Sequence, residues 1–353
     1  MRVCLVFNPS AGTAERVKDF LVHLTGKDRW EIRVPSDDAA LRELADEIRE
    51  GEYDRVAVGG GDGSINRIVQ ALAPDFPETP ISVLPFGTGN DLARSLGYSA
   101  NEMEEALRCT LEGATVRIDV VRWHGGDEDG WCVNVANGGF GGRVARDVTS
   151  DDKGRWGQLA YWTTGLGAVV EADGYEVRLE IDGETTDERV AGLAVANGRY
   201  VGGGFPIARE ALLDDGLLHV TAVRALPRLE LLATGMNYLL GRNGSDEVRT
   251  YTGRSVSVTS VPDLPFSIDG EAVQEFDAHF EVLERVLHVV RGPGEAALVE
   301  DREARERKRQ EQREKAEQEE SEGEEAEEKE AEEKAESGGA AADGGHGGEV
   351  TAR

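Results

Sequence analysis

A run of glycines with one carboxylate follows a short β-branched segment early in the chain. Residues 55–58 (Arg-Val-Ala-Val) predict a strand, residues 59–64 read Gly-Gly-Gly-Asp-Gly-Ser, and a helical pattern begins near Ile65. Glycine lets the backbone approach a phosphate closely, and a helix N-terminus presents free amides and partial positive charge. Asp62 adds a carboxylate of the kind that Mg²⁺ uses together with substrate oxygens. The run predicts a phosphate-binding loop, and the alternative is a tight strand-to-helix turn capped by Ser64.

Two further polar loops with glycines follow strand-like segments of the same region. Residues 8–12 (Asn-Pro-Ser-Ala-Gly) follow a strand-like segment at residues 3–7, and residues 85–91 (Pro-Phe-Gly-Thr-Gly-Asn-Asp) follow another at residues 81–84. Since ligands bind outside the carboxyl ends of parallel strands, we expect the three loops to converge on one edge of a sheet. Neither added loop has the lysine of a P-loop or the GxGxxG spacing, which disfavours the two commonest nucleotide-binding folds.

Later segments carry more carboxylates. Residues 197–204 (Asn-Gly-Arg-Tyr-Val-Gly-Gly-Gly) precede a Leu-Leu-Asp-Asp-Gly-Leu-Leu segment at residues 212–218. The four letters Ile-Asp-Gly-Glu occur twice, at residues 181–184 and at residues 268–271. Because Asp-Gly between two strands is a standard hairpin turn, either copy taken alone favours a structural role.

In their order and spacing these segments resemble the catalytic domain of the diacylglycerol kinase family, which includes bacterial soluble lipid kinases and the sphingosine and ceramide kinases. The resemblance covers roughly residues 1–290. It implies a structural magnesium site built from Asp215 and from the backbone carbonyls of Leu212 and Leu217. It also implies the following ATP contacts: Asn8, Pro9, Ser10, Ala11, Gly12, Ser36, Gly60, Gly61, Asp62, Gly63, Ser64, Ile65, Asn66, Thr88, Asn90 and Asp91.

The resemblance further implies a reactive pair, Asp269 and Glu271, in which Glu271 is the general base for a lipid hydroxyl. Asp62 and Asp91 would join this pair around a catalytic Mg²⁺. Phosphoryl transfer consists mostly of positioning and charge neutralisation, so one carboxylate near the nucleophile suits the chemistry. Only the family pattern and the place after Asp215 single out residues 268–271 over residues 181–184. One departure is that residues 206–211 stand where the family often has Ala-Pro.

The elements that must position these residues divide the chain into three parts. Up to residue 114, short β-branched runs alternate with helical patterns, which predicts a three-layer α/β nucleotide-binding domain. Strand-like segments with Asp-Gly turns follow over residues 115–299, which predicts a mostly antiparallel, β-sandwich-like domain with helices at residues 156–172 and 228–240 and a last segment that could return to the first domain. The active site is expected in the cleft between the two domains. Residues 300–353 predict an acidic, disordered tail, because they cannot bury enough apolar surface.

Charge narrows the classes of partner. The formal net charge is -30, and residues 300–353 hold 20 acidic and 10 basic residues, so the rest of the chain still carries -20. Lysine occurs before that tail only at Lys18, Lys27 and Lys153. This balance predicts a salt-adapted protein, with an ordinary acidic surface as the alternative, and it argues against DNA or RNA as a partner. A Debye length of about 3 Å at 1 M salt would still permit contact with an anionic membrane.

Targeting signals are weak in this sequence. Cys4, Cys109 and Cys132 form no close pair and no zinc-like spacing with histidine, which favours a reducing cytosol. We find no secretory signal pattern and no 18-residue apolar stretch. We therefore expect a cytoplasmic protein that meets a membrane lipid peripherally, and a homodimer is left open.

The function that these patterns predict is an ATP- and Mg²⁺-dependent lipid kinase. The acceptor would be the free hydroxyl of diacylglycerol or of a related lipid, including an ether lipid. Two alternatives remain open: an NAD kinase-like enzyme, which shares a Gly-Gly-Asp-Gly loop, and a nucleotide-binding regulator that has lost catalysis.

Overall fold

A computed structural model describes residues 1–7, 29–99, 103–139, 174–239, 246–275 and 277–294, together with residue 307. Residues 1–295 form one compact unit and residues 296–353 a second, and the description below concerns the first. Three predicted features lie outside the described residues: the loop at residues 8–12, the helix at residues 156–172, and the tail apart from residue 307.

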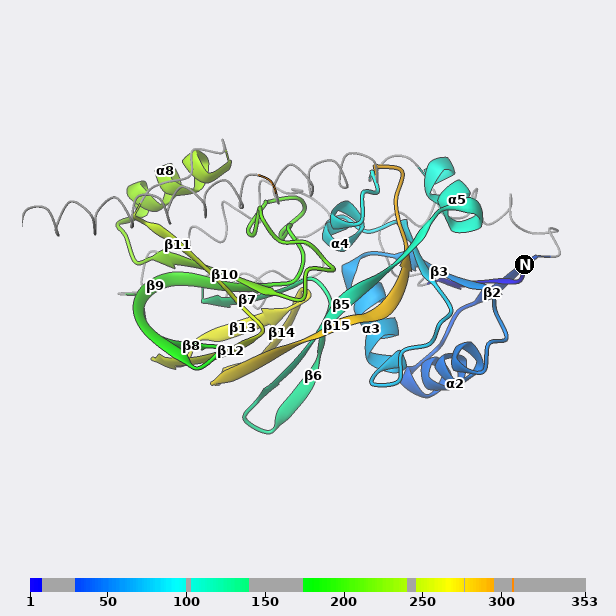
Figure 1. Cartoon of the computed structure of the whole chain (residues 1–353), viewed down its shortest axis with the longest axis horizontal. Coiled ribbons are helices and arrows are strands. Elements are labelled where there is room, and N and C mark those ends of the chain that lie inside the picture. Colours follow the sequence, from blue (N-terminus) through cyan, green and yellow to red (C-terminus); the bar gives the residue numbers. More distant parts are fainter. Residues whose placement is uncertain are drawn as a thin grey trace, which may run out of the picture. The chain divides into compact units, whose positions relative to one another are not determined.

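The first region is built on parallel strands in the order β4-β3-β1-β2. The strands are β1 (Val3–Phe7), β2 (Trp30–Arg33), β3 (Arg55–Gly60) and β4 (Ile81–Pro85). The helices are α2 (Asp38–Arg49), α3 (Asp62–Leu72), α4 (Asp91–Ser95) and α5 (Met103–Glu112). All side chains of β1 and β4 are buried, as expected for a sheet covered on both faces. In Figure 1, α2 and α3 lie below these strands and α5 lies above them.

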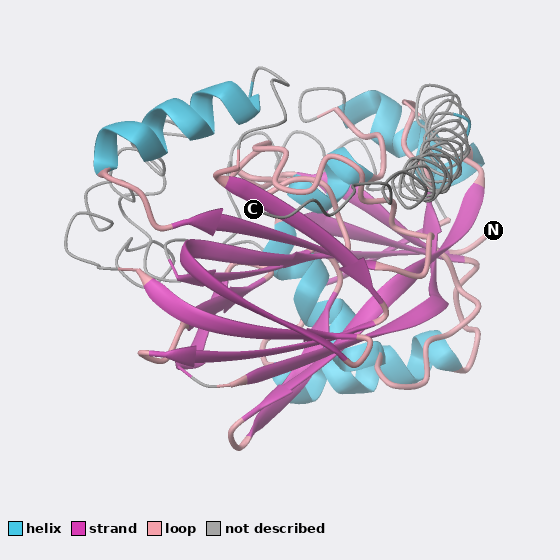
Figure 2. Ribbon diagram, turned by 60° about the vertical axis from the view of Figure 1, so that its left-hand side comes forward, coloured by secondary structure: helices cyan, strands magenta, loops and turns pink. Residues whose placement is uncertain are grey.

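The second region is mostly antiparallel sheet. Its elements are β5 (Thr115–Gly125), β6 (Glu128–Cys132), β7 (Val135–Gly139), β8 (Tyr175–Ile181), β9 (Glu184–Ala196), β10 (Leu218–Arg224), α8 (Arg228–Leu239), β11 (Val248–Gly253), β12 (Ser255–Val261), β13 (Pro265–Ile268), β14 (Glu271–Glu275) and β15 (Ala278–Val290). The path runs β14-β13-β7-β9-β8-β12-β15, with β10 on β9, β11 on β10, and β5 between β15 and β6. Figure 2 shows these strands crossing in two layers.

Strand β15 joins the two regions. It pairs with β5 along both halves, its first residues also pair with β12, and Val289 near its end pairs in parallel with Ile81 of β4. The register against β5 shifts between Leu283 and Leu287, where Arg285 has a φ of 53°. The bulge bends the strand between its antiparallel pairing with β12 and its parallel pairing with β4. The last strand of the second region therefore completes the sheet of the first.

Two large apolar clusters stabilise the regions. One packs α2, α3 and α5 on the parallel strands, and the other fills the space between the antiparallel strands around Phe266 and Phe280, both fully buried. The predicted combination of a three-layer α/β domain and a β-sandwich-like domain is confirmed. The boundaries at residues 114 and 299 stay predictions. No helix among the described residues is long and apolar enough to cross a membrane.

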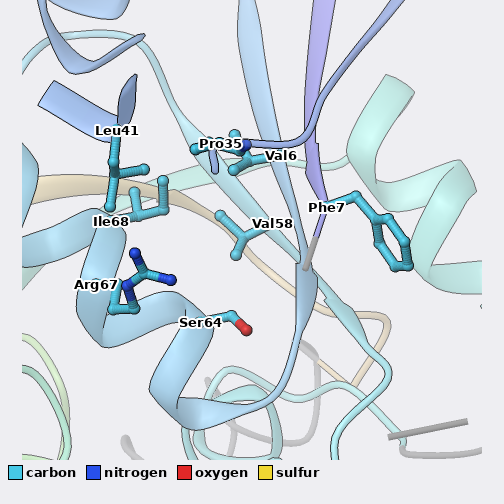
Figure 3. Close-up of a pocket in the computed structure, with 8 residues that line it drawn as sticks. All are labelled: Val6, Phe7, Pro35, Leu41, Val58, Ser64, Arg67 and Ile68. Atoms are coloured by element: carbon cyan, nitrogen blue, oxygen red, sulfur yellow. The ribbon is translucent and has the colours of Figure 1, made fainter. Parts of the chain in front are cut away.

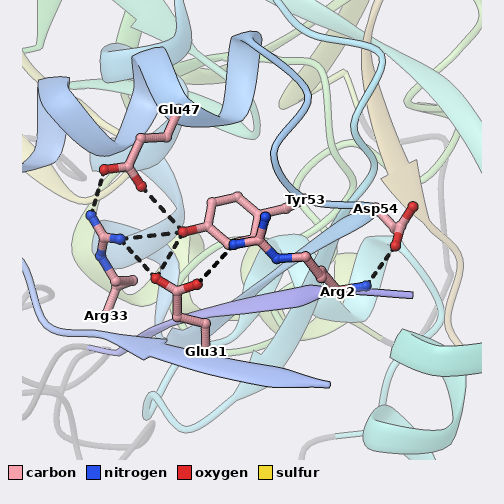
Figure 4. A network of polar contacts seen from close by, with 6 residues as sticks. All are labelled: Arg2, Glu31, Arg33, Glu47, Tyr53 and Asp54. Atoms are coloured by element: carbon pink, nitrogen blue, oxygen red, sulfur yellow. Dashed lines mark hydrogen bonds and ion pairs between the residues drawn. The ribbon is translucent and has the colours of Figure 1, made fainter. Parts of the chain in front are cut away.

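Strand β2, at the edge of the parallel sheet, is held by arginine. Glu31 accepts hydrogen bonds from Arg33 and from Tyr53, at 2.8 and 3.1 Å, and Arg33 also pairs with Glu47 of α2 at 2.7 Å. The hydrogen bond from Arg33 holds the pKa of Glu31 below its usual range. Figure 4 shows this network together with Arg2 and Asp54. Arginine suits it because one guanidinium can serve two carboxylates in a fixed geometry.

Candidate active site

The predicted phosphate loop is the turn from β3 into α3. Gly61 is the N-cap residue of α3, and its carbonyl accepts hydrogen bonds from the amides of Ser64 and Ile65. No side chain caps this end. Ser64 therefore lies inside the first helical turn, and the alternative in which Ser64 caps the turn is wrong. The first amides of α3 are left for a ligand or water, as at any uncapped helix start.

A second predicted loop lies against the first, backbone to backbone. A Cβ atom built on Gly87 would stand 2.4 Å from the Cα of Gly61 and 2.8 Å from Oδ1 of Asn90. Asn90 is buried in the left-handed conformation and donates from Nδ2 to the carbonyl of Gly87 at 2.7 Å. The loops at residues 60–64 and 85–91 thus converge as expected. Their contact needs glycine on both sides.

Three acidic side chains gather where these loops meet the second region. Asp62 accepts a hydrogen bond from the amide of Leu92 at 3.1 Å. Asp91 is 6% exposed, pairs with Arg94 at 3.2 Å, and accepts a hydrogen bond from the amide of Gly203 at 2.9 Å. Burial, then the charge of Asp91, and to a lesser degree that of Asp269, raise the pKa of Asp62 to about 6. Burial also raises the pKa of Asp91.

Gly89 lies close against two of these carboxylates. A Cβ atom at this position would lie 2.8 Å from Oδ2 of Asp62 and 3.5 Å from Oδ2 of Asp91. Mg²⁺ is usually bound by one or two carboxylates together with substrate oxygens and water. Asp62 and Asp91 are therefore the described residues that best fit a magnesium ion.

Asp269 has a different environment from the one expected of a reactive group. It is 6% exposed, and each of its oxygens is already hydrogen-bonded. Oδ1 accepts from the amides of Asn134 and Val135, both at 3.0 Å, and from the thiol of Cys132 at 3.3 Å. Oδ2 accepts from the amide of Val133 at 2.8 Å and from Nδ2 of Asn66 at 2.9 Å. These bonds make Asp269 an anchor for the backbone, so a catalytic role for it stays a prediction that this geometry does not favour.

The two Ile-Asp-Gly-Glu copies have the same local conformation. Asp269 and Asp182 have φ values of 48° and 50°, and the glycines that follow have 90° and 89°. Asp182 lies in an exposed turn and accepts from the amides of Arg254 and Ser255. Glu271 and Glu184 are both exposed, each at the start of its strand. Local sequence therefore sets the turn, and only its surroundings distinguish the copy at residues 268–271.

Asn66 and Ile65 do not present side chains to the loop. Ile65 is 3% exposed in the core and Asn66 is 4% exposed against Asp269, so only their backbone atoms remain for the predicted ATP contacts. Thr88 is exposed. These assignments stay predictions.

A small pocket lies beside the start of α3 (Figure 3). Its walls are mostly apolar, with two polar side chains, and the lining residues are Val6, Phe7, Pro35, Leu41, Val58, Ser64, Arg67 and Ile68. The guanidinium of Arg67 donates to Oδ1 of Asp38 at 2.8 Å. Ser36 follows Pro35 directly and donates to Asp37 at 3.0 Å. Arg67 lines this pocket and is not among the contacts expected from the sequence, although its place on α3 after Ser64 could have suggested it.

The predicted structural metal site has its own set of partners. Asp215 accepts from the amide of Leu217 at 3.1 Å and contacts Nε2 of His219 at 3.0 Å. Asp119, fully buried nearby, accepts from the amides of Gly216 and Arg285, both at 2.7 Å, and burial raises its pKa. The part of the chain that the structure describes contains no group of three or more His, Cys, Asp or Glu residues arranged for a metal ion. The site at Leu212, Asp215 and Leu217 stays a prediction. His219, which directly follows this segment, and Asp119 of β5 contact it and were not expected from the sequence.

Two family models of kinase domains match this chain. Residues 2–123 match the family model of the diacylglycerol kinase catalytic domain, and residues 134–291 match the YegS C-terminal NAD kinase beta sandwich-like domain. The chain is a kinase of two such domains. A probable lipid kinase YegS-like from Cronobacter sakazakii is 32% identical over 72% of this chain and 82% of that protein. The diacylglycerol kinase of Bacillus subtilis is 28% identical over 85% and 99%. This chain belongs to the lipid kinase family of YegS-like proteins and diacylglycerol kinases.

Solved structures agree on the fold. A crystal structure of a diacylglycerol kinase from Bacillus anthracis strain Sterne superposes with a TM-score of 0.66 at 20% sequence identity, covering 83% of this chain and 97% of that chain. At this identity the likeness concerns the fold alone.

Asp62 should destabilise the metal-free protein at neutral pH. Its folded-state pKa is raised, so the stability that it contributes at low pH is lost as the pH rises through about 6. Asp62→Asn keeps the oxygen that accepts from Leu92. We expect it to raise the free energy of unfolding by about 1–3 kcal/mol at pH 8 in EDTA, and to leave it unchanged near pH 4. Urea unfolding at both pH values measures this. The exposed Asp263→Asn is the control, and an equal gain at both pH values would contradict the account.

Replacing Asp269 should cost far more stability than replacing its counterpart in the other turn. Asp269→Asn turns an NH₂ group toward donors that now bind a buried carboxylate, so we expect a loss of about 3 kcal/mol. Asp182→Asn changes an exposed turn and should cost less than about 1 kcal/mol. Urea unfolding of the two variants compares them directly, and similar losses would show that Asp269 is no anchor.

Proposed function

We propose that this protein transfers the γ-phosphate of ATP to the free hydroxyl of a membrane lipid, such as diacylglycerol or a related ether lipid. The observation that carries the proposal is the meeting of the Gly60–Ser64 loop with carboxylates from both regions. Membership of the lipid kinase family supports an alcohol acceptor. It also argues against the NAD kinase alternative.

The donor would bind at the start of α3. The uncapped amides and the helix dipole favour phosphate there, and the apolar pocket beside Ser64 suits a nucleotide base. Asp62 and Asp91 would hold a magnesium ion, which supplies charge neutralisation for the phosphates when bound. Their raised pKa values are the expected state of such carboxylates before a cation arrives.

Glu271 would act on the acceptor. Its exposed carboxylate stands at the start of β14, two residues from the anchored Asp269. The lipid hydroxyl gives its proton to this carboxylate while its oxygen forms a bond to the γ-phosphorus. The bond from that phosphorus to the bridging oxygen breaks at the same time, and ADP leaves with the electron pair. A general base of this kind contributes about 10²- to 10⁴-fold to the rate.

The lipid would be met at the membrane surface. We infer a cytoplasmic protein that associates peripherally with the membrane and works at high salt, where screening allows a chain of net charge -30 to approach anionic lipids. Phosphorylation that rises with salt in vesicles of anionic lipid would support this inference. Full activity at low salt would count against the salt adaptation.

Glu271→Gln should abolish turnover, and Glu184→Gln should not. The two glutamates start strands after identical turns, so the pair separates a catalytic role from a local structural one. We expect the turnover of Glu271→Gln to fall at least about 100-fold with radiolabelled ATP and lipid extract, and that of Glu184→Gln to stay within about twofold of wild type. Equal activities of the two variants would contradict the assignment of Glu271 as the general base. An inactive wild type would favour the alternative of a nucleotide-binding regulator.

Arg67→Met should weaken ATP binding without slowing chemistry. The guanidinium, paired to Asp38, forms one side of the pocket and can stack on a base or pair with phosphate oxygens. We expect KM for ATP to rise about tenfold, the equivalent of one charged contact, with kcat within about twofold. The control is Arg42→Met, which removes an exposed arginine from the neighbouring α2. A similar rise in KM for both variants would mean that the loss of one positive charge, and not a contact of Arg67 with ATP, causes the effect.

A further inference from the structure

Helix α3 contacts the second region through two amide side chains one turn apart. Asn66 donates from Nδ2 to Oδ2 of Asp269 at 2.9 Å. Its Oδ1 accepts a hydrogen bond from Nε2 of Gln70 at 3.2 Å. Gln70 then pairs with the backbone of Trp131 in both directions: its Nε2 donates to the carbonyl at 2.6 Å, and its Oε1 accepts from the amide at 3.2 Å. Residues four apart on a helix share a face, so the two amides form a continuous row.

The charge of Asp269 fixes the direction of every bond in this row. A carboxylate only accepts, so Asn66 must turn its NH₂ group toward Asp269 and its oxygen toward Gln70. Gln70 must therefore donate from its own NH₂ group to Asn66, which leaves Oε1 to accept from the amide of Trp131. One arrangement of donors and acceptors therefore satisfies the whole row, as in a network with a unique solution.

The row links the two halves of the site. Its two amide side chains belong to α3, which begins at the Gly60–Ser64 loop. Asn66 binds Asp269, which starts the turn to Glu271. Asp269 also holds the amides of residues 133–135, which follow Trp131 on the same segment. Gln70 therefore binds residues 131–135, which run from the end of β6 to the start of β7, at Trp131, and Asp269 binds the same residues at 133–135.

We propose that Gln70 is a positioning residue for phosphoryl transfer, which sets the Glu271 turn relative to the phosphate loop through Asn66 and Asp269. The inference rests on the proposed function but concerns a residue that would touch neither ATP nor lipid. Catalysis of this kind depends on alignment, and a displacement of about 1 Å can cost about 10²-fold in rate. Gln70 itself is exposed, so replacing it should disturb alignment more than stability.

Two substitutions of similar size test the role. Gln70→Glu removes the donors and keeps an acceptor, whereas Gln70→Met removes both without adding charge, and all three residues have similar helix propensity. We expect both variants to lower kcat about tenfold with the dissociation constant for ATP within about twofold, and to speed deuterium exchange at the amides of Val133, Asn134 and Val135. Adding Asn66→Ala to Gln70→Met should lower kcat no further than Asn66→Ala alone, because members of one row are not additive.

Several outcomes would overturn the proposal. These are an unchanged kcat in Gln70→Met, a loss seen only in the charged Gln70→Glu, and a loss confined to ATP affinity. If Asn66→Ala does not fold, the two Gln70 variants decide alone. If the wild type phosphorylates no lipid, the proposed function fails, and exchange at residues 133–135 in the Gln70 variants still decides whether the row holds that segment. Unchanged exchange there would end the inference.

Discussion

The buried carboxylate of Asp269 is the interaction on which the candidate site depends. A charge taken out of water is tolerated only when hydrogen bonds replace its hydration, and here three backbone amides, one thiol and the side chain of Asn66 do so. Four of these donors come from residues 132–135, from the end of β6 to the start of β7, and the fifth comes from α3. The carboxylate of Asp269 thereby connects three features: the helix that follows the phosphate loop, strands β6 and β7, and the turn to Glu271. Asp91 makes a comparable bond in the opposite direction, from the first region to the amide of Gly203.

The same junction carries a cost that a ligand would relieve. Burial raises the pKa of Asp62, and the neighbouring charges of Asp91 and Asp269 raise it further. Functional sites commonly keep such like-charge arrangements, because the fold gains stability elsewhere. Here the large apolar clusters on either side supply that stability. A Mg²⁺–nucleotide complex would convert the repulsion into binding free energy.

Much of this arrangement could be predicted from sequence, and the exceptions have physical reasons. Alternating strands and helices and the Asp-Gly turns predicted the fold class, and the position of the two loops after strands of one domain predicted that residues 60–64 and 85–91 would meet. The anchoring of Asp269 could not be predicted from the sequence, since all of its donors lie more than 130 residues away along the chain, and Asn66 lies farthest. Its local motif is shared with Asp182, whose surroundings are wholly different. Gln70 escaped notice for the same reason, since its backbone partner, Trp131, lies 61 residues away along the chain.

The most direct test of the central claim follows the γ-phosphate itself. The protein would be incubated at high salt with ATP carrying ¹⁸O on its γ-phosphate, Mg²⁺, a total lipid extract and NAD, and the products analysed by mass spectrometry. The account predicts the label in a phosphorylated lipid that gained one phosphate on a hydroxyl group. Label in a phosphorylated dinucleotide, or in inorganic phosphate alone, would contradict it.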